Sequence, residues 1–191
     1  MPDAALDLHW LPLGAGGRSV RLNGRVFEAL SAACARRPRR DLFHAALTAH
    51  HDGADWAIEV APASEYHGAV ATGAVGCRAA GRLRVFRYEV RCWRGGVIPD
   101  LGEECGAPQR LSSDRETVAR TLDRIRAVPT PVWGRDELRA GEMWTSNSVV
   151  AWVLSGAGLA AEVALPSHGR APGWDAGLRV AAQPGTMQVW P

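Results

Sequence analysis

Three residues whose side chains could together perform acyl transfer occur in a defined order along the chain. His44 lies near the start of one strand-like run, Glu59 lies near the end of the next, and Ser148 follows Asn147 at the start of an apolar run. A hydroxyl, an imidazole and a carboxylate can serve as nucleophile, general base and orienting acid. We therefore expect Ser148 to attack a substrate carbonyl, His44 to accept its proton and Glu59 to fix the imidazole. The Ser148 N–H, with neighbouring amides at the helix start, would form the oxyanion hole.

The same three residues also have structural interpretations. A serine at the start of a helix is commonly a cap, and residues 145–147 beside it are equally good cappers. A strand histidine is usually a hydrogen-bonded structural residue, and an isolated glutamate is usually solvated. The helix dipole is worth only about 0.3–1 kcal/mol at an exposed site, too little to ionise a serine. Catalysis by Ser148 therefore depends on His44 reaching it.

Other kinds of site have weaker support in the sequence. The glycine-rich run 14–17 lacks both the Lys-Ser/Thr pair of a P-loop and the third glycine of a dinucleotide site, which favours a tight turn. His50, His51 and Asp52 predict a surface turn rather than a metal site, because adjacent strand side chains point to opposite faces. The four cysteines show neither a CxxC pair nor a zinc-like spacing. We predict no metal and no cofactor.

Composition narrows the functional classes further. The chain has 191 residues, 47% hydrophobic and 22% charged, which predicts a single globular domain over 1–191. All 22 basic residues are arginine, and the net charge of +2 predicts neither a nucleic-acid partner nor a membrane surface. The acidic start at 1–7 lacks the pattern of a secretory signal, and no apolar run has the length of a membrane span. The cysteine pattern favours reduced thiols in the cytoplasm.

Apolar periodicity predicts an alternation of strands and helices. Strands are expected at 6–13, 42–50, 56–60, about 70–75 and 83–93, with closing strands at 178–180 and 187–189. Helices are expected at 24–36, at 114–127 after a capping box at 113–116, and from Ser148 to Gly156 or Gly158. The stretches 95–110 and 133–146 are expected to be irregular.

Three details of these elements bear on the site. The Asp52-Gly53 turn predicts antiparallel pairing of 43–50 with 55–60, which would bring His44 and Glu59 to one face. A phase slip in the strand at 83–93 indicates a β-bulge near 86–87. The arginines at 36–40 predict a solvated helix end. The expected fold is α+β, with a small, mostly antiparallel sheet packed against the buried helix that begins at Ser148.

The order of these motifs resembles the circularly permuted papain-like branch of the NlpC superfamily, which includes lecithin–retinol acyltransferase-like proteins. The resemblance spans roughly 42–160 and is carried by His44 in FHAAL, Glu59 in AIEV and Ser148 in NSVV. It implies a permuted papain-like fold and a hydrolase or acyltransferase acting on an amide, ester or thioester. The whole chain also resembles a group of actinobacterial proteins through 10–17 and 131–136, which implies no activity.

This chain departs from that family at the nucleophile. The family uses cysteine where this chain has Ser148, and Cys34 lies too close to His44 in sequence to replace it. Two functional hypotheses follow. One is a Ser-His-Glu enzyme with Asn147 beside the nucleophile. The other is a catalytically inactive ligand- or partner-binding domain on the same fold, with His44, Trp133 and Trp144 lining a groove.

Overall fold

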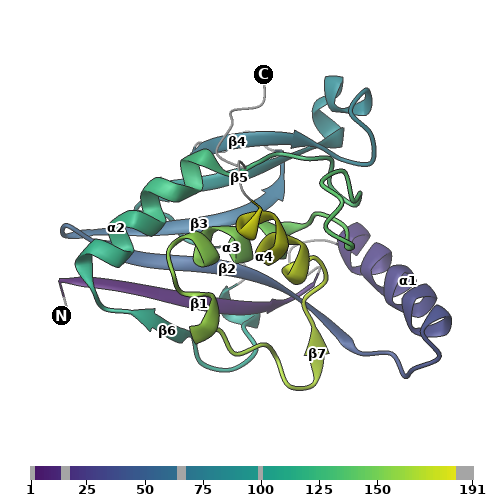
Figure 1. Ribbon diagram of the computed structural model, residues 1–191, viewed down its shortest axis with the longest axis horizontal. Helices are drawn as coiled ribbons and strands as arrows, with labels where there is room; N and C mark the ends of the chain where they lie inside the picture. Colours follow the sequence, from purple (N-terminus) through teal and green to yellow (C-terminus); the bar gives the residue numbers. More distant parts are fainter. Residues whose placement is uncertain (1–2, 14–17, 64–67, 99–100, 184–191) are drawn as a thin grey trace.

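A mostly antiparallel sheet forms the centre of the molecule. The computed structural model describes residues 3–13, 18–63, 68–98 and 101–183, which contribute seven strands to it. The strands are β1 (Ala4–Pro12), β2 (Asp41–His51), β3 (Ala54–Pro62), β4 (Ala69–Ala74), β5 (Arg87–Arg94), β6 (Gln109–Ser112) and β7 (Gly169–Arg170). Their spatial order is β4-β5-β3-β2-β1-β6, and β7 pairs in parallel with the start of β2 (Figure 1).

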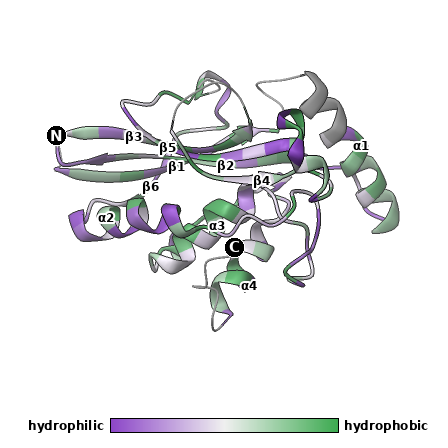
Figure 2. Ribbon diagram, turned by 90° about the horizontal axis from the view of Figure 1, so that it is seen from above, coloured by the Kyte–Doolittle hydropathy of each residue, from purple (hydrophilic) through white to green (hydrophobic). Residues whose placement is uncertain are grey.

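Three of the four α-helices in the described residues lie on one side of this sheet. The four are α1 (Arg18–Cys34), α2 (Arg115–Arg124), α3 (Ser146–Gly156) and α4 (Trp174–Ala182). In Figure 2, α2, α3 and α4 lie below one face of the sheet, and α1 lies beyond its end. The predicted α+β fold, with an antiparallel sheet packed against a buried helix, is confirmed. Within the described residues, no helix combines the length and the apolar character needed to cross a bilayer.

Helix α3 is the centre of the hydrophobic core. Every residue from Ser146 to Leu154 is buried, which explains why the run 149–154 is apolar on all sides: the sheet covers one side of the helix and α4 covers another. The sheet contributes residues of alternating positions to this core, among them Phe43, Ala45 and Leu47 of β2. We refer to this side of the sheet as the helical face.

The predicted antiparallel hairpin of β2 and β3 is present, although the paired residues are 47–51 and 54–58 rather than 43–50 and 55–60. Leu47 pairs with Ile58 and His51 with Ala54, so the strands are antiparallel around the turn at 52–53. Asp52 and Gly53 have φ values of 52° and 68°, as a type I′ turn requires. His50 and His51 lie on opposite faces and contact Asp55 and Asp52 respectively, which agrees with a turn rather than a metal site.

The opposite side of the sheet, the open face, is partly covered by the segment that follows β5. Ile98 of this segment packs in a small buried cluster with Leu11, Ala46 and Ala57. Further along, the Cys105 N–H donates to the Trp10 carbonyl oxygen at 2.9 Å. These two contacts hold the segment against β1, β2 and β3.

Several predicted elements are wrong in extent or type. The predicted strand at 178–180 is part of α4, and the one at 187–189 lies outside the described residues, as does the turn at 14–17. The strand predicted at 83–93 begins only at Arg87, after a 3-10 turn, so this start and not a bulge explains the phase slip. The cap of α2 is Asp114, whose carboxylate accepts from the Thr117 N–H at 2.8 Å.

The arginine-rich end of α1 is not wholly solvated. Glu28 is buried, and its carboxylate accepts from the Arg37 guanidinium, the Arg40 N–H and the Arg170 guanidinium. These donors hold the pKa of Glu28 at about 2, chiefly through the Arg37 hydrogen bond. The carboxylate therefore ties α1 to the segment that carries β7.

Candidate functional site

Ser148 is part of the capping box at the start of helix α3. Its hydroxyl oxygen accepts from the Thr145 N–H at 2.9 Å, and its proton is donated to the Gly173 carbonyl oxygen at 2.6 Å. Ser148 is fully buried, with an exposed fraction of 0%. Gly173 has a φ of 85°, and a Cβ there would lie 2.6 Å from the Ser148 hydroxyl oxygen. The hydroxyl of Ser148, the predicted nucleophile, is therefore enclosed by backbone groups that occupy both its acceptor and its donor positions.

Asn147 joins α3 to strand β2. Its amide oxygen accepts from the Ala45 N–H at 2.8 Å, and its amide nitrogen donates to the Phe43 and Pro172 carbonyl oxygens at 2.9 and 3.0 Å. Asn147 is 2% exposed. These bonds satisfy backbone groups of β2 and of the segment that leads into α4. Asn147 therefore positions the helix against the sheet rather than a substrate.

His44 and Glu59 lie on the open face. His44 alternates with Phe43 and Ala45, and Glu59 alternates with Ile58 and Val60, which all point to the helical face. The two predicted partners therefore share a face, as the hairpin prediction requires. Ser148 belongs to a helix on the other side. The structure does not bring the predicted nucleophile together with its predicted base.

Trp133 and Trp144, the predicted groove residues, pack with the main core. Trp144 is 2% exposed and belongs to the main core. Trp133 is partly buried against the same core, and its ring lies 5.2 Å from that of Tyr88. Both rings stabilise the loop that leads into α3, as aromatic pairs and buried rings commonly do.

A different nucleophile–base–acid arrangement is assembled on the open face. The His9 Nδ1 atom lies 3.0 Å from a Glu104 carboxylate oxygen, and the His9 Nε2 atom lies 2.8 Å from the Thr48 hydroxyl oxygen. An ionised carboxylate can only accept, so in the neutral imidazole Nδ1 carries the proton and Nε2 accepts from the Thr48 hydroxyl. We call these three residues the Thr48 relay.

The sheet and the covering segment position the Thr48 relay. His9 of β1 and Thr48 of β2 lie on neighbouring strands, on the same face of the sheet. Glu104 directly follows the 3-10 turn η3 (Leu101–Glu103) and is held over β1 by the contacts of Ile98 and Cys105. His9 is 6% exposed, so solvent competes little for its hydrogen bonds.

A cavity of about 340 Å³ opens beside Thr48. This volume falls within the range of small-ligand sites, about 300–1,000 Å³. An ion pair between Arg110 and Asp7 at 2.5 Å and a hydrogen bond between His50 and Asp55 at 2.7 Å border it. The lining residues are Ala5, Asp7, Thr48, Ala49, His50, Asp55, Trp56, Gly96 and Arg110.

Sequence reasoning missed the Thr48 relay because its members are far apart along the chain. His9 and Glu104 are separated by 95 positions, and His9 and Thr48 by 39. Asp7 and His9 are the two polar residues of an otherwise apolar strand and lie two positions apart, which is a signal that this strand has a polar face. The register of β1 against β2 and the position of Glu104 have no local signature.

Metal binding has no visible basis in the described part of the chain. No three or more histidine, cysteine, aspartate or glutamate side chains gather there in an arrangement suited to a metal ion.

Comparisons with protein-family models, with curated proteins and with solved structures gave no match for this chain. Function is therefore inferred from the side-chain geometry itself.

Proposed function

We propose that this protein is a hydrolase or acyltransferase whose nucleophile is Thr48, with His9 as general base and Glu104 as the orienting acid. The observation that carries the proposal is the Thr48 relay, with contacts of 2.8 and 3.0 Å beside an open cavity. A hydroxyl, a base within hydrogen-bond reach and a third group orienting that base are the signature of an activated nucleophile.

The proposed reaction proceeds in two steps. The Thr48 hydroxyl oxygen attacks the substrate carbonyl carbon while its proton passes to His9 Nε2. The Glu104 carboxylate stabilises the imidazolium through Nδ1–H. His9 then returns the proton to the leaving group, and an acyl ester remains on Thr48. In the second step His9 deprotonates water or an acceptor hydroxyl, which attacks the ester carbonyl carbon. As the bond to the Thr48 oxygen breaks, the imidazolium returns this proton to that oxygen.

Arg110 is placed to stabilise the negative charge that develops on the carbonyl oxygen. In register, Thr48 pairs with Asp7 on one side of β1, and Asp7 pairs with Arg110 on the other. The three residues therefore form one row across the open face, and Arg110 lines the same cavity as Thr48. Because the Arg110 guanidinium already donates to both Asp7 carboxylate oxygens, it would contribute N–H donors, rather than an uncompensated charge, to the developing oxyanion.

The cavity favours a small acyl group carried by an ester or thioester. Ester and thioester carbonyls are more electrophilic than amide carbonyls, so they are the easier targets for the secondary hydroxyl of Thr48. His50 and Asp55 provide polar groups at the border of the cavity, beside the small side chains of Ala5 and Ala49. As part of this proposal we place the enzyme in the cytoplasm, because its four cysteines are all unpaired.

Hydrolysis of p-nitrophenyl acetate tests the proposal. Thr48→Val removes the hydroxyl from a side chain of similar shape, and His9→Asn removes the base; each should lower kcat/KM by at least about a hundredfold. Thr48→Ser should retain activity. Thr117→Val is the matched control, since the Thr117 hydroxyl accepts from Arg120 on helix α2. Equal activity of the wild type, Thr48→Val and Thr117→Val would reject Thr48 as nucleophile.

A ligand-binding domain without catalysis is the second candidate. Ser148 stands where the permuted papain-like branch has its nucleophile, and its hydroxyl is buried and hydrogen-bonded. A domain that keeps this fold without a reactive group at that position is expected to bind a ligand rather than to catalyse. We also propose that this chain is related to the permuted papain-like branch. A binding domain should show no turnover in any of these variants.

A further inference from the structure

The connection between β4 and β5 carries apolar side chains that are largely exposed. Leu83, Val85 and Phe86 are 60%, 78% and 44% exposed. They lie in and just before the 3-10 turn η2 (Arg84–Phe86), which has no buried residue. This segment projects at the edge of the sheet beyond β4 in Figure 1. Clustered exposed apolar side chains commonly mark a surface that binds a partner or a membrane.

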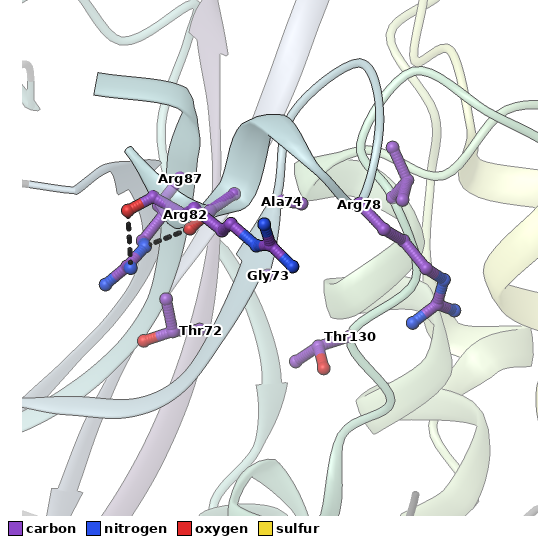
Figure 3. Close-up of a pocket in the computed structure, with 9 residues that line it drawn as sticks. Thr72, Gly73, Ala74, Arg78, Arg82, Arg87 and Thr130 are labelled. Carbon is purple, nitrogen blue, oxygen red and sulfur yellow. Dashed lines mark hydrogen bonds between the residues drawn. The ribbon is translucent and has the colours of Figure 1, made fainter. Parts of the chain in front are cut away.

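Arginines flank these apolar residues in the sequence, at positions 82, 84 and 87. Arg78, Arg82 and Arg87 line a cavity of about 420 Å³, together with Thr72 and Thr130. Figure 3 shows the Arg82 guanidinium extended across this cavity between Arg78 and Arg87, with the two threonines below it. No carboxylate is among the described residues that line the cavity.

The charges of this cavity are only partly compensated. Arg78 forms two hydrogen bonds of 2.9 Å with Glu137. Arg87 donates to the backbone carbonyl oxygens of Gly81 and Arg82, which neutralise no charge. In the part of the chain that the structure describes, no carboxylate forms an ion pair with the Arg82 guanidinium. The net charge of +2 for the whole chain therefore conceals a locally cationic site.

We infer that this segment, residues 82–86 with the arginine cavity behind it, docks on an anionic lipid bilayer. Leu83, Val85 and Phe86 would enter the boundary between headgroups and acyl chains, while Arg82 and Arg78 bind lipid phosphates. Arginine recognises phosphate through several N–H donors, and the hydroxyls of Thr72 and Thr130 supply further O–H donors.

The combination of side chains favours a bilayer over a nucleic acid. A nucleic-acid site would place aromatic rings for base stacking among the arginines, whereas two of the three exposed apolar residues here are aliphatic. An interfacial segment needs apolar residues that enter the lipid and basic residues that contact the headgroups, and the sequence of 82–87 provides both. The inference does not depend on the Thr48 relay.

Co-sedimentation with lipid vesicles tests the inference. The full chain should sediment with phosphatidylcholine vesicles containing about one-third phosphatidylglycerol and remain in solution with phosphatidylcholine alone. Val85→Ser should weaken binding about tenfold and Arg82→Gln about fivefold. The matched controls are Val97→Ser and Arg94→Gln. Val97 is 73% exposed and follows β5, and Arg94 is the last residue of β5, at the end away from residues 82–86. Neither control should change binding.

Three results would overturn the inference. The first is a wild-type chain that does not sediment with the anionic vesicles. The second is equal loss of binding in Val85→Ser and Val97→Ser, which would show that the apolar segment has no special role. The third is tighter binding to single-stranded RNA than to the vesicles, which would identify the arginine cavity as a nucleic-acid site.

Discussion

At the scale of single residues, the hydroxyls of Ser148 and Thr48 differ in what receives their proton. The Ser148 hydroxyl donates to the Gly173 carbonyl oxygen inside the core, whereas the Thr48 hydroxyl faces His9 beside a cavity. A carbonyl oxygen cannot act as a general base at neutral pH, but a neutral imidazole can. The environment of each hydroxyl, more than the intrinsic reactivity of serine or threonine, determines which one could be activated.

The first prediction concerns Ser148→Ala. This change removes the acceptor of the buried Thr145 N–H and one of two donors to the Gly173 carbonyl oxygen, which keeps the Gly177 N–H. The free energy of unfolding should therefore fall by about 1–3 kcal/mol. Ester hydrolysis should continue. Urea unfolding measures the stability, and Ser155→Ala, near the end of the same helix, serves as control. Loss of hydrolysis at unchanged stability would instead identify Ser148 as the nucleophile.

The sequence predicts the location of the residues at the start of α3 but not their role. Asn147 and Ser148 are polar residues that open a buried helix, and this position is compatible with both a cap and a nucleophile. His44 and Glu59 are expected on one face, as they are. Their relation to Ser148 depends on which face of the sheet α3 covers, and local sequence patterns do not contain that information.

At the scale of elements, the segment after β5 acts as a cover that carries Glu104 to His9. Ile98 is 1% exposed and anchors this cover, while its neighbour Val97 is 73% exposed. The position of the orienting acid therefore depends on an apolar contact outside the Thr48 relay.

The second prediction follows from this anchor. Ile98→Ala should loosen the cover and lower kcat for ester hydrolysis about tenfold or more, because small misplacements of catalytic groups are costly. Val97→Ala should have no effect. Hydrogen exchange of residues 101–105 should accelerate in Ile98→Ala only. Unchanged exchange and unchanged kcat would show that Glu104 is held by other contacts.

Long elements with strong periodicity are predictable from the sequence, and short ones are not. The β2–β3 hairpin and helix α2 agree with the sequence pattern, because turn residues and a cap define their ends. Part of helix α4 has the pattern of a strand because Leu178 and Val180 alternate around Arg179. In α4 the buried residues Trp174, Gly177 and Val180 follow helical spacing, whereas Leu178 is only partly buried. The short alternation is therefore incidental, and packing against α3 selects the helix.

At the scale of the whole molecule, the two faces of the sheet have different tasks. The helical face contains most of the apolar core and gives stability. The open face carries the polar residues and the cavity beside Thr48. The cationic segment at 82–86 lies before β5, at the end of that strand away from Gly96, which borders the Thr48 cavity. When this protein binds a bilayer through residues 82–86, the cavity beside Thr48 would remain open to solvent.

The third prediction concerns the attachment of α1 to this body. The pKa of Glu28 is lowered from 4.5 to about 2, so the unfolded chain binds its proton first as the pH falls. The stabilisation by Glu28 is therefore complete above the unfolded pKa and is lost progressively towards the folded pKa. It should amount to roughly 3 kcal/mol.

Urea unfolding as a function of pH measures this contribution. The stability difference between the wild type and Glu28→Gln should shrink between about pH 5 and pH 2. Glu116→Gln, at an exposed acid of α2, should show no such change. A difference independent of pH would show that the Arg37, Arg40 and Arg170 contacts do not stabilise the ionised form.

The central claim, that Thr48 is the activated hydroxyl of this protein, is tested most directly by locating a covalent adduct. The intact protein is treated with a fluorophosphonate, digested, and analysed by peptide mass spectrometry. The Thr48 relay predicts an adduct on Thr48 that disappears in His9→Asn and persists in Ser148→Ala. An adduct on Ser148, or hydrolysis of p-nitrophenyl acetate with no adduct on Thr48, would contradict it.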